Sequence, residues 1–471
     1  MSGLETVSLS TGLWAVFGIC LLMTFFFEFV NGFHDTANAV ATVIYTKTLK
    51  PIHAVIWSGI WNSLGVLFSS YFLGLAVATK IANLLPVEAV LSQSTAQAAC
   101  MILAVLCGAI VWNLGTWYLG IPCSSSHTLI GAILGVGLVF STLPENTTHS
   151  TVDWAEAIKI GESLLFSPLF GFSMAVLFMF ILRSAMQSES RKSIFKPPVD
   201  DNPPPLWIRA ILVTTCTLVS FGHGSNDGQK GLGILMLALI SFMPLRYSLS
   251  PDFEAQHAVQ SLTLIQQNLP TDITSTYAPK ELKLVGQNIE DLKQDIKTVT
   301  DLKSRLNIRK RLGLLGKNIK TLLDEPNVIT NIEARDTIKK ETASLTTLSH
   351  YVPNWAIALI SIALGLGTMI GWKRIVVTIG EKIGKRHMTY AEGATAEVIA
   401  AVTIGLATLN GLPVSTTHVL SSGVAGAMVA SKGVKNLQRG TIANIALAWI
   451  LTLPASILLA GGFYLFFRLF V

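Results

Sequence analysis

Two polar motifs, each present twice and in the same order, interrupt the long apolar runs of this chain and limit its fold more than any other feature. The motif that contains Asp35 recurs around Asp227, 192 residues later. The motif at 120–127 recurs at 411–418, 291 residues later, so the second copy holds 99 more residues between its motifs. Charged and hydroxyl side chains inside apolar runs of membrane-spanning length are costly unless they line a cavity. Duplicated halves of this kind predict an inverted-repeat secondary transporter.

The composition places the chain in a membrane. Hydrophobic residues make up 51% of its 471 residues and charged residues only 13%, whereas soluble domains carry about 25% charged residues. The first apolar run, 13–30, has no basic leader and no small-residue cleavage site after it, so we expect a retained span. The net charge of +6 comes from basic residues beside apolar runs, which favours a role in membrane orientation over nucleic-acid binding. The five cysteines show no CxxC spacing, which predicts neither a disulfide framework nor a zinc site.

Apolar runs of the roughly 20 residues that cross a bilayer fall at 53–79, 97–119, 163–182, 353–371, 390–411 and 441–467. Two more, 13–46 and 206–243, carry the Asp motifs, and the Gly-rich stretches 120–140 and 412–430 either cross or re-enter as hairpins. Counting each as one pass gives five passes per half, and an odd number predicts that the halves are inverted. The basic loops then share one side of the membrane. By the positive-inside rule that side is cytoplasmic, which puts both termini and the stretch 246–350 outside.

The predicted fold class is therefore an all-α polytopic membrane protein, with broken helices at the Asp motifs and Ser/Thr-rich re-entrant hairpins. Its parts are a first membrane repeat (1–195), a Pro-rich linker (196–205), a second membrane repeat (206–245 and 351–471) and a soluble helical insert (246–350). In the insert, apolar residues from Leu282 to Leu306 recur at spacings of three and four, which predicts one amphipathic helix. We expect a small helical subdomain that packs on itself or on the membrane domain, with a partner-binding coiled coil as the alternative.

The first motif pair predicts a polar site where two helices break. Gly32, Gly224, Gly228 and Gly231 permit the chain to leave helical geometry, and unwound backbone at membrane depth belongs where it lines a polar cavity. The two carboxylates are candidates for binding or relaying a coupling cation. An internal polar network that only joins the two halves is the alternative. The residues assigned to cation coupling are Asp35, Asp227, Asn38, Asn226 and Lys230.

The second motif pair predicts an anion site. Each copy places a proline and hydroxyl residues before a helix-length apolar run, and these are the residues that begin and cap helices. A helix N-terminus presents spare N–H groups to an anion, so two such ends from inverted repeats could surround a tetrahedral oxyanion. Ordinary capped helices are the alternative. The candidate phosphate ligands are Ser124, Ser125, Ser126, Ser415, Thr416, Thr417 and, from the first motif pair, Gln229.

Three further groups are candidates for carrying a proton: His127, His418 and Glu28. A histidine near a helix cap is more commonly a structural hydrogen-bonding group, and Glu28 could equally pair with Lys230. Lys230 stands where the first repeat has Asn38. A fixed ammonium there would repel a sodium ion, which favours proton coupling, unless this lysine snorkels to an interface.

Residues 31–38, 224–231, 122–127 and 413–418 resemble the duplicated signatures of the inorganic phosphate transporter (PiT) family. The runs NGFHDTANAVATVIYT and GSNDGQKG resemble its bacterial low-affinity Pit branch, and the resemblance covers nearly all of both membrane halves. It implies phosphate uptake across the bacterial inner membrane, coupled to a cation gradient, with phosphate held between the Ser/Thr hairpins and the Asp motifs. For the bacterial branch it implies proton symport of a neutral divalent-metal phosphate complex. No cofactor or fixed metal site is expected, and a homodimer is left open as the assembly.

The sequence departs from the family's commoner Gly-Ala-Asn-Asp-x-Ala-Asn pattern at two positions. His34 replaces an Asn, and Lys230 stands where an Asn is expected; both changes weaken the case for a sodium site in the second half. The prediction is a phosphate importer that works by proton symport and is not an enzyme, since no nucleophile, metal cluster or nucleotide loop is recognisable. A sodium-coupled phosphate or sulfate permease is the alternative. A second alternative is a phosphate-sensing membrane protein that signals through the insert.

Overall fold

The computed structural model describes residues 9–85, 90, 93–146, 152–186, 192–198, 202–251, 253–270, 279–297, 302–325, 328–349 and 351–471. In these ranges the elements are helical, apart from one isolated β-bridge between Gly384 and Leu437. This confirms the predicted all-α class. Residues 199–201 of the predicted linker lie outside the described ranges.

The chain divides into two compact units, one of Gly12–Ala238 with Asn354–Val471 and one that contains Leu239–Pro353. The first half of the larger unit contains α1 (Thr11–Asp35), α2 (Ala37–Tyr45), α3 (Pro51–Phe68), α4 (Ala76–Leu84), α6 (Thr95–Tyr118), α7 (Ser125–Ser141) and α8 (Trp154–Ala185). The second half contains α9 (Leu206–Phe242), α15 (Asn354–Met369), α16 (Lys373–Val377), α17 (Tyr390–Leu409), α18 (Thr416–Lys432) and α19 (Arg439–Phe467). The repeated motifs align α1 and α2 with α9, and α7 with α18.

Seven helical spans in the described part of the chain are long and apolar enough to cross a membrane: Thr11–Tyr45, Pro51–Leu73, Thr95–Tyr118, Ala157–Ala185, Leu206–Phe242, Tyr390–Leu409 and Arg439–Phe470. They include every predicted span except 353–371, where α15 has only 16 residues. Helices α7 and α18, which follow the two Ser/Thr motifs, have 17 residues each. The multi-pass membrane protein predicted from composition is confirmed.

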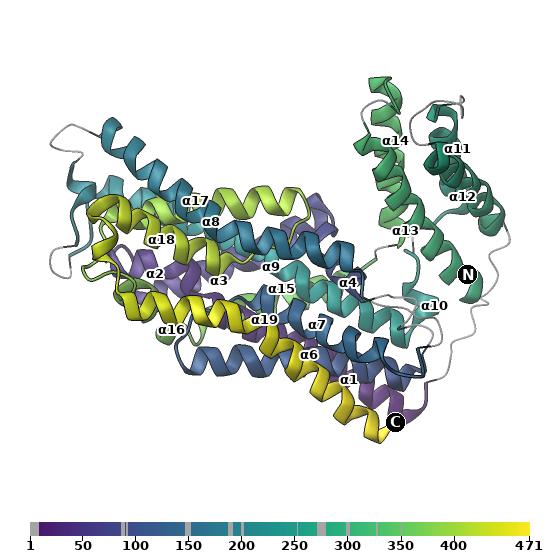
Figure 1. Ribbon diagram of the computed structural model, residues 1–471, viewed down its shortest axis with the longest axis horizontal. Helices are drawn as coiled ribbons and strands as arrows, with labels where there is room; N and C mark the ends of the chain where they lie inside the picture. Colours follow the sequence, from purple (N-terminus) through teal and green to yellow (C-terminus); the bar gives the residue numbers. More distant parts are fainter. Residues whose placement is uncertain are drawn as a thin grey trace. The chain divides into compact units, whose positions relative to one another are not determined.

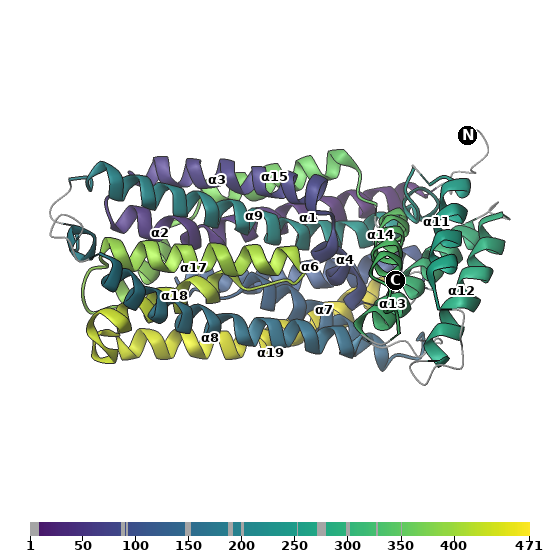
Figure 2. The same cartoon turned by 90° about the horizontal axis from the view of Figure 1, so that it is seen from above.

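One helix of each half packs against a helix of the other half. Helix α7 packs on α19 of the other half and on its neighbour α6, while α18 packs on α8 of the other half and on its neighbour α17. Helices α3 and α15, which occupy matching places in the two repeats, pack on each other and lie side by side in Figures 1 and 2. This reciprocal pattern is what a two-fold relation between repeats produces. It brings the N-terminal ends of α7 and α18 to the middle of the unit.

The predicted break at the second Asp motif is wrong, because α9 runs without interruption from Leu206 to Phe242. At the first motif only Thr36 separates α1 from α2, and its backbone angles are helical. The motif glycines instead allow helices to approach closely. A Cβ at Gly224 would lie 2.0 Å from the carbonyl oxygen of Asn62 on α3, and one at Gly32 would lie 2.2 Å from the Leu364 carbonyl on α15. Small residues commonly have this role where membrane helices pack.

The smaller unit is a helical subdomain with its own apolar core. It contains α11 (Ala255–Asn268), α12 (Pro279–Lys297), α13 (Leu302–Asp324) and α14 (Ile332–Ser349), and α12 packs on both α11 and α13. Val285, Ile289 and Leu292 from α12 are fully buried in this core. The amphipathic stripe is therefore real, but the single helix predicted over 282–306 is wrong in length, since α12 ends at Lys297 and α13 begins at Leu302.

Candidate functional site

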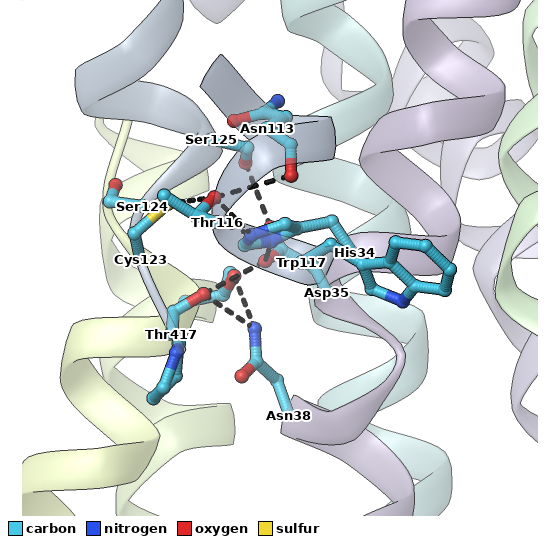
Figure 3. A network of polar contacts seen from close by, with 12 residues as sticks. His34, Asp35, Asn38, Asn113, Thr116, Trp117, Cys123, Ser124, Ser125 and Thr417 are labelled. Carbon is cyan, nitrogen blue, oxygen red and sulfur yellow. Dashed lines mark hydrogen bonds and ion pairs between the residues drawn. The ribbon is translucent and has the colours of Figure 1, made fainter. Parts of the chain in front are cut away.

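The two motif carboxylates meet at the centre of the larger unit. Asp35 ends α1 and Asp227 lies within α9, and both are buried. The Ser125 hydroxyl donates to Asp35 Oδ2 at 2.8 Å and lies 3.4 Å from Asp227 Oδ2. From the first turn of α18 in the second repeat, the Thr417 hydroxyl donates to Asp35 Oδ1 at 2.9 Å (Figure 3). Both repeats thus contribute a carboxylate and a hydroxyl to one polar centre.

The hydroxyl residues of the second motifs line the same centre at the first turns of α7 and α18. Asn38 Nδ2 donates to Thr417 Oγ1 at 2.9 Å and to Thr416 Oγ1 at 3.3 Å. Ser124 and Ser415 cap the two helices, because each side chain accepts a hydrogen bond from the backbone N–H three residues later at 3.1 Å. All six hydroxyl side chains are buried. The two helix ends and the hydroxyls form an environment suited to an oxyanion.

Lys230 lies in this centre and not at an interface, so the alternative that it snorkels is wrong. Its side chain is 1% exposed, and Nζ lies 2.7 Å from Asp227 Oδ1. The same ammonium donates to the Ser126 hydroxyl and, at 3.3 Å, to the carbonyl oxygen of Val414. The ammonium therefore lies between one motif carboxylate, the Ser126 hydroxyl of the first repeat and the Val414 carbonyl of the second.

Two histidines join the centre that sequence reasoning did not assign to it. His34 Nδ1 lies 3.0 Å from Asp35 Oδ1. His223 Nε2 lies 3.7 Å from Asp35 Oδ2 and 3.6 Å from Asp227 Oδ2. The alignment of the two repeats could have indicated both histidines, because His34 aligns with Asn226 and His223 aligns with Asn31. Each repeat therefore supplies one His and one Asn, in exchanged positions.

Asp35, His223 and Asp227 could together hold a metal ion. One ligand atom from each lies within 4.8 Å of the others, and all three residues are buried. Two carboxylates with one imidazole suit a divalent ion of intermediate hardness.

Gln229 and Asn226 were both predicted to belong to the site, but they make their hydrogen bonds to groups other than the two carboxylates. Gln229 Oε1 accepts from the backbone N–H groups of Val77 and Ala78 at 3.0 and 3.3 Å, and its Nε2 donates to the Gly74 carbonyl at 3.0 Å. It therefore caps α4. Asn226 holds the hairpin of the second repeat, since Nδ2 donates to the Leu412 carbonyl at 3.0 Å and Oδ1 accepts from Val414 N–H at 3.2 Å.

The three proton-carrier candidates lie beside the centre. The rings of His127 and His418 face each other with centroids 4.6 Å apart, and His418 also stacks on Trp449 at 3.9 Å. Glu28 is fully buried and accepts from Asn31 Nδ2 at 3.4 Å. Glu397 accepts from the hydroxyls of Thr42 and Thr215 and so ties α17 to α2 and α9.

Comparison with known proteins identifies the family. The sequence model of the phosphate transporter family matches residues 31–460. The chain belongs to this family. The transporter is 38% identical to the low-affinity inorganic phosphate transporter PitB of Escherichia coli K12, over 97% of this chain and 98% of that protein. It is 41% identical to the low-affinity inorganic phosphate transporter of Buchnera aphidicola from Schizaphis graminum, over 96% of each chain. Membership confirms the predictions of the family and of a transporter, not an enzyme.

A solved structure supports the fold of the transporter. The structure described as "The sodium-dependent phosphate transporter" superposes with a TM-score of 0.56 at 19% sequence identity, and it covers 97% of this chain and 100% of that chain. At this identity the likeness is one of fold.

Proposed function

We propose that the transporter imports inorganic phosphate by proton symport and takes it up as a neutral divalent-metal phosphate complex. The proposal rests above all on Lys230, whose ammonium pairs with Asp227 within the hydroxyl-lined centre. The relatives described as inorganic phosphate transporters support the substrate. Ser125, Ser126, Thr416 and Thr417 are the proposed phosphate ligands, with Ser124 and Ser415 as the caps that orient the two helix ends.

The carboxylate beside the hydroxyls favours phosphate over sulfate. An ionised carboxylate repels a bare oxyanion, but it accepts a hydrogen bond from a P–OH group. Hydrogen phosphate carries such a group at neutral pH and sulfate does not. Asp35 already accepts from Ser125 and Thr417, so it lies where a phosphate held by these hydroxyls would present its proton.

The divalent cation of the substrate complex would lie between the carboxylates. Asp35, His223 and Asp227 place three ligand atoms within 4.8 Å of one another. A metal ion there would reduce the repulsion between the two carboxylates and the incoming oxyanion. The ion travels as cargo, so it would be bound only in the loaded state, mainly by Asp35 and His223, because Asp227 then carries the coupling proton.

The ion pair offers a route to proton coupling. A proton that binds Asp227 neutralises the carboxylate and frees the Lys230 ammonium to bind phosphate. When phosphate leaves on the other side, the ammonium pairs with Asp227 again and the carboxyl loses its proton. A sodium ion alone at the same carboxylate would lie beside the ammonium, which is only 2.7 Å from the oxygen, and this is unfavourable at such a distance. The divalent ion would avoid that cost because it enters in a neutral complex whose phosphate contacts the ammonium.

We also place the transporter in a bacterial inner membrane, with its basic loops in the cytoplasm and with both termini and the 246–350 insert outside. The distribution of lysines and arginines supports this orientation. A C-terminal fusion to a reporter that is active only outside the cytoplasm should be active, and an inactive fusion would reverse the orientation.

The coupling test uses purified transporter in proteoliposomes with radiolabelled phosphate. A pH gradient at clamped membrane potential should drive accumulation, and a sodium gradient at constant pH should not. Uptake driven by sodium alone would establish the sodium-coupled alternative. Excess sulfate should not compete, and removal of divalent ions with a chelator should reduce uptake, whereas uptake that is insensitive to the chelator would exclude the metal complex as substrate.

A further inference from the structure

Cys123 and His34 form a buried thiol–imidazole pair that the proposed transport cycle does not use. Cys123 Sγ lies 3.6 Å from His34 Nε2 and 3.1 Å from Thr116 Oγ1, and the Thr116 hydroxyl lies 3.3 Å from the same ring nitrogen. The thiol is free and fully buried. Figure 3 shows this pair beside Asp35 and the first turn of α7.

The imidazole is oriented as it is in metal sites. His34 Nδ1 faces Asp35 Oδ1 at 3.0 Å, and an Nδ1–H that donates to a carboxylate leaves the lone pair on Nε2. Ring nitrogens that ligate metals commonly have such a carboxylate on the opposite side of the ring. Ser125 and Thr417 in turn donate hydrogen bonds to Asp35. Asp35 therefore keeps its position and orients the His34 ring, whose Nε2 lone pair faces Cys123.

The second repeat shows that packing does not require these two donor groups. His34 aligns with Asn226, and Cys123 aligns with Val414. There the backbone N–H of Val414 donates to Asn226 Oδ1 at 3.2 Å, and the valine side chain offers no donor group. The first repeat therefore holds a thiol and an imidazole where an amide and a valine suffice for the fold.

The spacing of the pair fits a tetrahedral ion. Zinc bonds of about 2.3 Å to sulfur and about 2.0–2.1 Å to nitrogen, at a tetrahedral angle, separate the two ligand atoms by about 3.6 Å, and the observed separation is 3.6 Å. Asn113 lies one turn before Thr116 on α6 and is fully buried. Among the described residues, neither amide atom of Asn113 has a hydrogen-bond partner. Helix α6 therefore carries, one turn from Thr116, a buried amide whose hydrogen bonds are not made within the described residues.

We propose that Cys123 and His34 bind a thiolate-seeking divalent cation, Zn²⁺ or Cd²⁺, in place of the thiol proton. The incoming ion forms bonds to Sγ and Nε2, and the proton that leaves sulfur passes to solvent. Cysteine and histidine together select such ions over Mg²⁺ and Ca²⁺. Spacing along the chain predicted no zinc site because the two ligands are 89 residues apart and meet only in the fold.

The bound ion would join α1 to the turn between α6 and α7. These elements carry Asp35 and the first hydroxyl motif, which must move relative to each other if the centre opens to either side. The ion should therefore inhibit phosphate uptake. This consequence rests on the proposed function, whereas metal binding itself does not.

Binding is tested on the purified full-length transporter with Cd²⁺ and X-ray absorption at the cadmium edge. We expect one sulfur ligand per bound ion. Cys123→Val and His34→Asn, which copy the second repeat, should each weaken Cd²⁺ binding more than about tenfold, since even outer partners of a metal site contribute about 10- to 100-fold. Cys216→Val, at another buried thiol, is the matched control and should bind as the parent does. Cys123→Ser serves if the valine variant does not fold.

Two results would overturn the proposal. The first is Cd²⁺ bound without a sulfur ligand in the parent chain, and the second is sulfur ligation that survives in Cys123→Val. In proteoliposomes, Zn²⁺ should slow uptake by the parent and not by Cys123→Val, each compared with its own rate without zinc. If Cd²⁺ binds with a sulfur ligand but zinc leaves uptake unchanged, the site stands and the inhibitory consequence is rejected.

Discussion

At the scale of residues, the ion pair of Lys230 with Asp227 sets the chemistry of the site. Both side chains are almost completely buried, and the ammonium also contacts hydroxyl and carbonyl oxygens of the two hairpins. Loss of one member of a buried pair leaves an uncompensated charge, which costs about 3–5 kcal/mol. Substitutions at these two positions therefore act on stability and on coupling together, and a test has to separate the two.

Lys230→Asn should lower the melting temperature of the detergent-solubilised transporter and strongly reduce uptake driven by a pH gradient. The double variant Asp227→Asn/Lys230→Asn removes both charges, so its melting temperature should return most of the way to that of the parent while uptake stays low. Thermal melts and proteoliposome uptake measure the two quantities separately. Parent-like uptake by the single variant would contradict a role of this ammonium in coupling.

Ser125→Ala should raise the phosphate concentration that gives half-maximal uptake by about 10- to 100-fold. The variant loses a hydroxyl that reaches both carboxylates, and a hydrogen bond to a charged group contributes about 1.5–3 kcal/mol. Ser141→Ala, at the last residue of the same helix, removes only a bond to the Leu138 carbonyl and should leave the concentration dependence unchanged. Equal half-saturating phosphate concentrations for the two variants would mean that phosphate binds elsewhere.

At the scale of elements, the close approach of α9 to α3 fixes the position of Asp227. Gly224→Ala should destabilise the transporter by about 1–3 kcal/mol, because the added Cβ would lie 2.0 Å from the Asn62 carbonyl oxygen. Uptake should fall with it. Gly115→Ala on α6 is the control, since nothing lies within 4 Å of its Cβ position and alanine favours a helix more than glycine does. A Gly224→Ala variant as stable as the control would refute the close packing of these helices.

At the scale of the whole molecule, the insert has its own apolar core and can be perturbed separately from the membrane unit. Ile289→Ala should destabilise the insert by about 2–5 kcal/mol, because Ile289 is fully buried in that core. Leu284→Ala on the same helix removes a side chain that is 45% exposed and should have little effect. In a transporter, hydrogen exchange in the insert should increase for Ile289→Ala while phosphate uptake stays at the parent level.

A loss of uptake in Ile289→Ala, with normal uptake in Leu284→Ala, would show that the insert takes part in transport. Normal uptake combined with a lost transcriptional response to phosphate would favour the sensing alternative.

The sequence by itself determined the membrane class, the all-helical fold and the family, because apolar runs and repeated motifs are local properties of a chain. It also placed hydroxyls at Ser124–Ser126 and Ser415–Thr417 at helix starts, where the structure has them as caps and first turns. The tertiary structure alone decided which side chains meet across helices. Gly224 looked like a point of unwinding and is a contact with α3, Gln229 caps α4, and His223 reaches both carboxylates. Periodicity reveals which face of a helix is buried but not which helix covers it, so a pair such as His34 and Cys123 becomes visible only when the helices are packed together.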